Sequence, residues 1–256
     1  MESYILLALA GIGIGTVASM VGVGGGVFMV PLLVLSGLVS TTQAAVGTSI
    51  AGVMFTSISS SLAYWRRGAI DVRVGLAIVP GALMGGWFGA WVSQWIASGW
   101  LAVAFGVFLL YPALTMILGS GPKEMFSPSG GRTRLAALRA PAVGAVAGTV
   151  SGLFGLGGGT VMVPAMMLLL GLDIRRAVAT SLFVMIPSAA LATSQHALQG
   201  NSRWELAVPL IIGIVAGAQL GPVLGARVPR RRLRQLFGLV LVYGAVNMVL
   251  KGLGLR

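Results

Sequence analysis

Apolar residues occur along the chain in long runs, which short polar or glycine-rich breaks separate. Runs of roughly 20 apolar residues are typical of transmembrane helices. The pattern therefore predicts an all-α integral membrane protein. Read from the runs and their breaks, the expected helical segments are residues 4–21, 27–38, 43–64, 72–95, 99–118, 140–154, 161–170, 177–198, 206–226 and 233–250.

The breaks follow the same order twice. A motif G-x-G-G-G-x-x-x-V-P occupies residues 22–31 and returns at residues 155–164. After the loss of one residue, the pair Thr48-Ser49 aligns with Thr180-Ser181. One single-residue gap over the whole comparison indicates an internal repeat, not a chance likeness.

The repeat divides the chain into two transmembrane units. We predict a first repeat over residues 1–118 and a second over residues 140–256. Residues 119–139, rich in Gly, Pro, Ser and basic side chains, form the expected polar cytoplasmic connector. Each unit is expected to consist of a glycine-broken, hairpin-like segment followed by three transmembrane helices.

The composition agrees with a membrane protein, because 57% of the residues are hydrophobic and only 9% are charged. A net charge of +12 would suggest nucleic acid as the partner of a soluble protein. In a membrane chain, loop arginines instead set the orientation and contact anionic lipid. We therefore expect the lipid bilayer as a partner and no nucleic acid. The sequence leaves open whether the chain forms a homo-oligomer.

The basic residues favour two inverted repeats. If each glycine motif joins segments that enter and leave on one side, both termini lie outside and 14 of the 17 basic residues are cytoplasmic. If each glycine segment crosses once, the split becomes 10 against 7. We therefore predict a multi-pass protein of the inner membrane; re-entrant hairpins and thin full crossings both stay open. The 14 residues are Arg66, Arg67, Arg73, Lys123, Arg132, Arg134, Arg139, Arg175, Arg176, Arg227, Arg230, Arg231, Arg232 and Arg234.

The glycine breaks are the first candidate substrate site. A broken membrane helix must satisfy its freed backbone groups in protein or in a water-lined cavity. Free N–H groups at a helix N-terminus favour anions, and matched breaks in inverted halves indicate a midplane site. The alternative is that these glycines only permit close helix packing, which we favour for those at four-residue spacing, residues 81, 85, 89, 213, 217 and 221. The candidate binding residues are Gly24, Gly25, Gly26, Gly157, Gly158 and Gly159.

Polar side chains within the apolar segments extend the candidate site. The hydroxyls of Thr48, Ser49, Thr180 and Ser181 could donate to an anion, or each could bond the carbonyl four residues earlier in its own helix. Both alternatives stay open. Gln195 is a further candidate donor. His196, the only histidine, is expected at the membrane interface and not as a proton carrier.

Residue types that carry other chemistry are missing from the predicted segments. All five acids, Glu2, Asp71, Glu124, Asp173 and Glu205, fall in termini or expected loops, so no carboxylate is left for a membrane proton relay. Paired carboxylates, metal-ligand clusters and a nucleophile beside a histidine are lacking as well. The glycine motifs also lack the third glycine of a dinucleotide fingerprint and the lysine of a P-loop. We therefore predict no enzyme, no cofactor and no metal.

The doubled glycine motif, in a small two-repeat chain with matching Thr-Ser pairs, resembles the sulfite exporter TauE/SafE family over essentially the whole chain. The resemblance implies export of sulfur-containing anions such as sulfite, sulfoacetate or other organosulfonates. Residues 24–26 and 157–159 match the family motif residue by residue, whereas the Thr-Ser pairs are inferred as site residues from the internal repeat alone. An anion channel, an uptake carrier and a structural membrane protein stay open as alternatives. Because Val27 in one copy aligns with Thr160 in the other, an asymmetric site is a further alternative.

Overall fold

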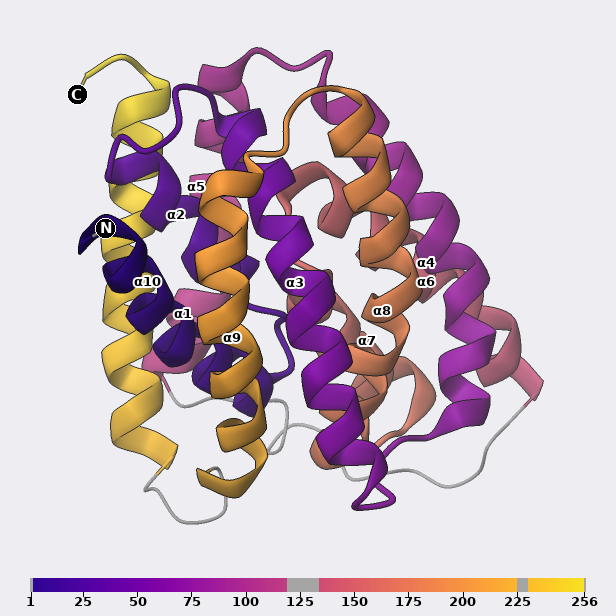
Figure 1. Ribbon diagram of the computed structural model, residues 1–256. Helices are drawn as coiled ribbons and strands as arrows, with labels where there is room; N and C mark the ends of the chain where they lie inside the picture. The colour runs from indigo at the N-terminus through magenta and orange to yellow at the C-terminus, as the bar shows by residue number, and fades with distance from the viewer. Residues whose placement is uncertain (1, 119–133, 225–229, 256) are drawn as a thin grey trace.

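The computed structural model describes residues 2–118, 134–224 and 230–255 (Figure 1). Within them the chain forms ten α-helices and no strand. The helices are α1 (Glu2–Val21), α2 (Gly26–Leu35), α3 (Thr42–Trp65), α4 (Val72–Ser93), α5 (Ser98–Leu118), α6 (Arg134–Phe154), α7 (Gly159–Leu170), α8 (Ile174–Leu198), α9 (Trp204–Leu224) and α10 (Arg230–Gly252).

Each predicted segment coincides with one helix, and most boundaries agree within about three residues. The largest difference concerns α6, which begins at Arg134 and not at residue 140. Its first six residues, Arg-Leu-Ala-Ala-Leu-Arg, are all good helix formers, although their two arginines read as part of a polar connector. The remainder of that expected connector, residues 119–133, lies outside the described residues.

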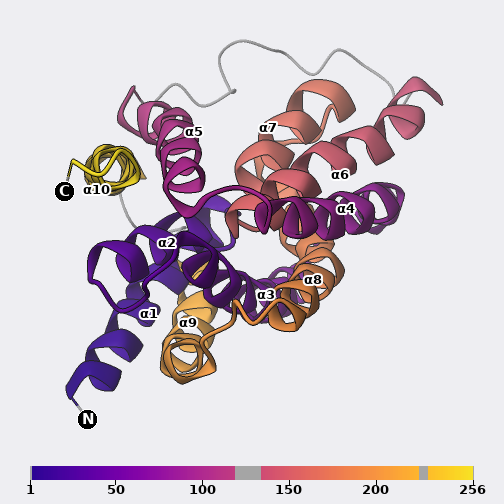
Figure 2. The same ribbon diagram turned by 90° about the horizontal axis from the view of Figure 1, so that it is seen from above.

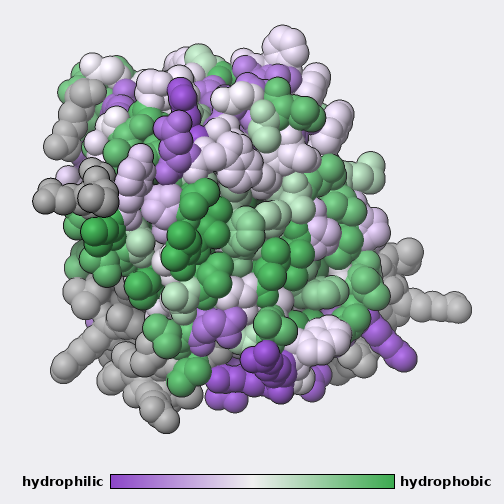
Figure 3. Space-filling view, viewed as in Figure 1, coloured by the Kyte–Doolittle hydropathy of each residue, from purple (hydrophilic) through white to green (hydrophobic). Residues whose placement is uncertain are grey.

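The described part of the chain has the helix lengths of a membrane protein. Six helices, α1, α3, α4, α5, α8 and α9, are long and apolar enough to span a bilayer by length and composition. With 10 and 12 residues, α2 and α7 reach about 15 and 18 Å, roughly half of a 30 Å hydrocarbon core. Hydrophobic residues cover the middle of the face drawn in Figure 3, and hydrophilic residues gather towards its upper and lower margins.

The two halves interlock through their helix pairs. The first helix of each half packs along the fourth helix of the other, as α1 on α9 and α6 on α4, while α3 packs on α8 and α5 on α10 (Figure 2). Glycines at four-residue spacing line these pairs. A Cβ at Gly85 would overlap the carbonyl oxygen of Ala145 on α6, and one at Gly217 would overlap that of Ile12 on α1. The expectation that these glycines permit close helix packing is confirmed.

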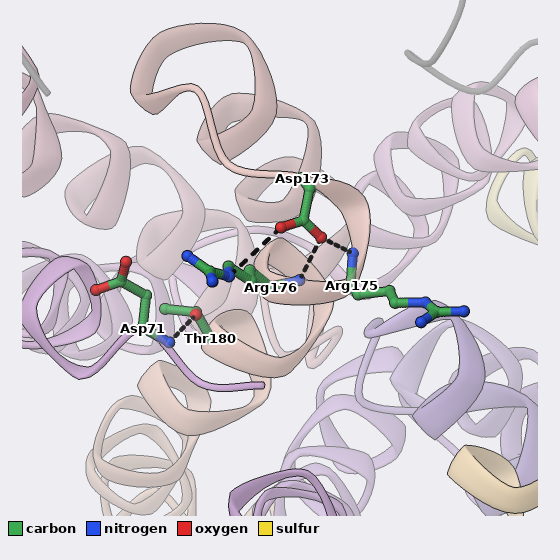
Figure 4. Close-up of polar contacts among 5 residues, drawn as sticks. All are labelled: Asp71, Asp173, Arg175, Arg176 and Thr180. Carbon is green, nitrogen blue, oxygen red and sulfur yellow. Dashed lines mark hydrogen bonds and ion pairs between the residues drawn. The ribbon is translucent and has the colours of Figure 1, made fainter. Parts of the chain in front are cut away.

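The short helices α2 and α7 run from the centre of the molecule to opposite ends. The C-terminal turn of α2 lies at the end where the Lys251 Nζ donates to the Val34 carbonyl oxygen, 2.6 Å away. The C-terminal turn of α7 leads directly to Asp173, the residue that caps the start of α8. The α3–α4 turn lies at this same end of the molecule. The α3–α4 turn meets α8 there, because the backbone N–H of Asp71 donates to the Thr180 hydroxyl at 3.0 Å (Figure 4).

Candidate functional site

Both glycine motifs form tight loops that end in a helix N-terminus. Gly25 precedes α2 with φ 92° and Gly158 precedes α7 with φ 76°, a left-handed conformation that favours glycine. Because both N-cap residues are glycines, neither can cap its helix with a side chain. The first N–H groups of a helix have no acceptor within the helix, so each loop presents donors at the positive end of the helix dipole.

The two loops touch each other at the centre of the molecule. A Cβ at Gly26 would overlap the carbonyl oxygen of Gly155, and a Cβ at Gly159 would overlap that of Gly22. A Cβ at either middle glycine, Gly24 or Gly157, would meet Val53 of α3 and Met185 of α8, which occupy matching positions in the two halves. The absence of side chains therefore allows backbone to lie directly on backbone.

The serines of the two Thr-Ser pairs hold this crossing together. Ser49 Oγ lies 3.2 Å from the carbonyl oxygen of Gly155 and 2.9 Å from that of Val46. Ser181 Oγ lies at the same two distances from the oxygens of Gly22 and Val178. Each hydroxyl hydrogen is thus shared between its own helix and the glycine loop of the other half. The structure brings both serines to the candidate site, where they act on the loops.

The threonines of the pairs point to helix starts. Thr48 Oγ1 donates to the Ala44 carbonyl oxygen at 2.6 Å and accepts from the backbone N–H of Arg203 at 3.0 Å. For Thr48, the structure therefore has the bond to its own helix, one of the two alternatives left open by the sequence. Thr180 Oγ1 accepts from the N–H of Asp71 (Figure 4). Both hydroxyls lie buried against the turns that precede α9 and α4.

Thr48→Val and Thr180→Val are each expected to destabilise the ligand-free protein by about 1 to 3 kcal/mol, because a buried N–H loses its acceptor. Thr56→Val is the matched control, since this buried hydroxyl on α3 donates to the Gly52 carbonyl of its own helix. Thermal unfolding in detergent measures the effect. Equal melting temperatures for the Thr48 and Thr56 variants would show that the bond to Arg203 contributes nothing.

Two polar residues near the end of α8 lie away from the glycine loops. Gln195 is half-buried and ten residues beyond Met185, about 15 Å along the helix axis. His196 lies in the last turn of α8, near a helix end as expected, and its side chain is fully buried within the protein. Its Nε2 lies 2.9 Å from the Gly152 carbonyl oxygen and donates to it, because a carbonyl only accepts. The helix end is covered by α6, a tertiary contact that the sequence pattern does not reveal.

The three acids that occur within the described turns and helices after residue 70 all lie at helix starts. Asp71 caps α4, and Asp173 caps α8 by accepting from the N–H groups of Arg175 and Arg176 (Figure 4). Glu205 lies in the first turn of α9. Carboxylates at these positions stabilise helix N-termini. The ion pair between Asp173 and Arg176, 3.5 Å long and more than half exposed, contributes little.

Sequence reasoning did not place two hydroxyls that lie beside the start of α7. Ser151 of α6 and Thr160 of α7 are buried, and neither side-chain oxygen has a hydrogen-bond partner among the described residues. The signal that could have found them is the comparison of the repeats. It aligns Ser151 with Ala18 and Thr160 with Val27, and only the second difference stood out beside the glycine motif.

Comparison with known proteins places the whole chain in one group. The family model described as "Sulfite exporter TauE/SafE" matches residues 7–248. The chain is 31% identical to the probable membrane transporter protein YunE of Bacillus subtilis (strain 168), over 98% of this chain and 99% of that protein. It is 27% identical to the probable membrane transporter protein MJ0441 of Methanocaldococcus jannaschii, over 96% and 95% of the two chains. No solved structure matches it.

Proposed function

The chain belongs to the sulfite exporter TauE/SafE family of membrane transporters, and from this premise we propose that it exports small sulfur-containing anions across the cell inner membrane. Sulfite, sulfoacetate and other organosulfonates are the proposed substrates. The binding site lies at the two glycine-broken helices, near the middle of the membrane. The candidate donors are the backbone N–H groups at the starts of α2 and α7.

The observation that carries this proposal is the pair of uncapped helix N-termini at the centre of the molecule. Both begin directly after a left-handed glycine, and both are too short to cross the bilayer alone. In hydrocarbon, such N–H groups would lack any partner, so they need protein, water or an anion. Backbone donors and the aligned helix dipole supply an anion with hydrogen bonds and a favourable potential.

The directions of the helices support inverted repeats with hairpin-like glycine segments. Helix α1 has the length of a full span, whereas the shorter α2 returns from the centre towards the Lys251 end. Helix α7 runs from the centre to the opposite end. Arg175 and Arg176 lie at that second end with the α3–α4 turn, and Arg203 lies at the first. By the positive-inside rule, the second end faces the cytoplasm and both termini face the periplasm.

Single cysteines test this orientation, because the natural chain has none. Arg175→Cys and Arg203→Cys replace exposed residues at the two ends. An impermeant thiol reagent added to intact cells is expected to label the Arg203 variant at once and the Arg175 variant only after the membrane is permeabilised. Labelling of the Arg175 variant in intact cells would show that the proposed membrane orientation is wrong.

Transport itself is tested with purified protein in liposomes. Sulfite and sulfoacetate, loaded on one side, are expected to cross at a rate that saturates with concentration, with each anion inhibiting the flux of the other. Electrical current that rises without saturation would instead indicate an anion channel. If folded protein passes none of these anions in either direction, the proposed function is wrong. The alternative of a structural membrane protein, whose glycines serve helix packing only, would then be favoured.

A further inference from the structure

The two glycine loops share one backbone design but differ in the side chains beside it. Ser151 on α6 takes the place of Ala18 on α1, and Thr160 in the first turn of α7 takes the place of Val27 in α2. The second half therefore has two hydroxyls where the first half has only methyl groups. This difference makes the two helix N-termini chemically unequal.

Both hydroxyls lie at the start of α7. Thr160 is the second residue of the helix, and Gly158 immediately precedes the helix. A Cβ placed on Gly158 would lie 3.4 Å from the Cβ of Ser151, so this side chain stands against the N-terminus. In the first half, Ala18 has the same distance to the matching position at Gly25. The position of this side chain is thus the same beside both loops, and in the second half it carries a hydroxyl oxygen.

These oxygens are buried and without partners among the described residues. Ser151 is 1% exposed and Thr160 is 6% exposed. Burying a hydroxyl without a hydrogen bond costs stability, and the first half shows that alanine and valine fit the same surroundings. A ligand that accepts from both hydroxyls would offset that cost. The first N–H groups of α7 are directed towards the same helix end, because helix N–H groups point towards the N-terminus.

We propose that the transported oxyanion binds at the N-terminus of α7 and not at that of α2, with Ser151 and Thr160 donating to its oxygens. This inference rests on the proposed function and identifies the half of the site that recognises the substrate. Two hydroxyls beside backbone N–H groups suit a group with several acceptor oxygens around one atom, as in sulfite or a sulfonate. They offer a single-atom halide fewer well-directed bonds.

The helix direction adds a polarity to this site. Because α7 runs from the centre to the end at which Asp173 lies, its N–H groups face the opposite end, where α8 joins α9. In the proposed orientation that end faces the periplasm. The donors at this midplane site therefore point towards the side to which an exporter releases its substrate.

The test is the affinity of purified protein for sulfoacetate, measured by calorimetry and by ligand-induced thermal shift. Ser151→Ala and Thr160→Val are each expected to weaken binding about tenfold, the equivalent of one lost polar contact. The melting temperature without ligand should stay level or rise, because neither substitution removes a hydrogen bond. A gain in ligand-free stability together with a loss of affinity separates a binding role from a structural one.

Ser61→Ala is the matched control, since Ser61 on α3 is also a buried hydroxyl without a partner among the described residues but belongs to the first half. Its affinity for sulfoacetate should equal that of the natural protein. If the double variant Ser151→Ala/Thr160→Val binds as tightly as the natural protein, this inference is overturned while the proposed function stands. If the natural protein binds neither sulfoacetate nor sulfite, the proposed function falls, and this inference with it.

Discussion

Alanine at Gly26 or Gly159 is expected to prevent the two glycine loops from crossing and thereby to remove both folding stability and transport. At each position the new Cβ would overlap a carbonyl oxygen of the other loop, from Gly155 or Gly22. These carbonyls cannot move freely, because Ser49 and Ser181 bind them from α3 and α8. Forcing backbones apart in a packed interior costs about 3 kcal/mol or more.

A control separates this overlap from ordinary glycine strain. Gly37 has φ 71°, and a Cβ there would meet nothing within 4 Å. Gly37→Ala therefore isolates the cost of a left-handed alanine, about 1 to 2 kcal/mol. Gly26 and Gly159 begin α2 and α7 without a positive φ, so without the overlap alanine would cost less there than at Gly37. We expect instead that the Gly26 and Gly159 variants unfold at clearly lower temperature than the Gly37 variant and show no flux. Melting temperatures above that of the Gly37 variant would mean that the loops do not lie against each other.

Gly25 and Gly158 belong to a second class of position. Both have φ > 0, and each immediately precedes a helix. At Gly25 an added Cβ would meet only side-chain atoms, whereas at Gly158 it would lie 2.5 Å from the Ala147 carbonyl oxygen. The loop before α7 is therefore the more constrained of the two, in agreement with its role in the inferred oxyanion site.

Local patterns predict much of the fold. Apolar run lengths and glycine breaks place the ten helices within a few residues, since hydrophobic length and backbone freedom are properties of a short stretch. The doubled motif also identifies the family correctly. The start of α6 differs because helix propensity and charge compete there, and the helix extends over residues 134–139, which the sequence pattern assigned to the connector.

The candidate site is predicted less completely, because its contacts join distant parts of the chain. The bond from Ser49 to Gly155 spans 106 positions, and no local pattern indicates it. The threonine beside it instead contacts the start of α9, and His196 is buried by α6. Alignment of the repeats relates such contacts in pairs, since a contact in one half recurs at the matching positions of the other. Tyr64 donates to the carbonyl oxygen of Ser19, and the aligned His196 donates to that of the aligned Gly152.

The helix pairs of this fold depend on backbone contact, which alanine on one face of a helix should disrupt. In a bilayer, lipid is as apolar as a leucine side chain, so helices associate through close packing, which small residues permit. On α1, a Cβ at Gly15 would overlap the carbonyl oxygen of Ile214 on α9, whereas a Cβ at Gly13, on the opposite face, would meet nothing within 4 Å. The two glycines are two residues apart in the same helix.

Gly15→Ala is therefore expected to destabilise the protein by about 1 to 3 kcal/mol, through separation of α1 from α9. Gly13→Ala should stabilise it by about 0.5 to 1 kcal/mol, because alanine restricts the unfolded chain and favours a helix. Thermal unfolding of both variants in one detergent gives shifts of opposite sign. Gly217→Ala lies on α9, where it faces α1. In the Gly15→Ala background it should destabilise the protein less than it does alone, because the first substitution already separates the two helices. Shifts of the same sign at Gly13 and Gly15 would show that these backbones do not touch.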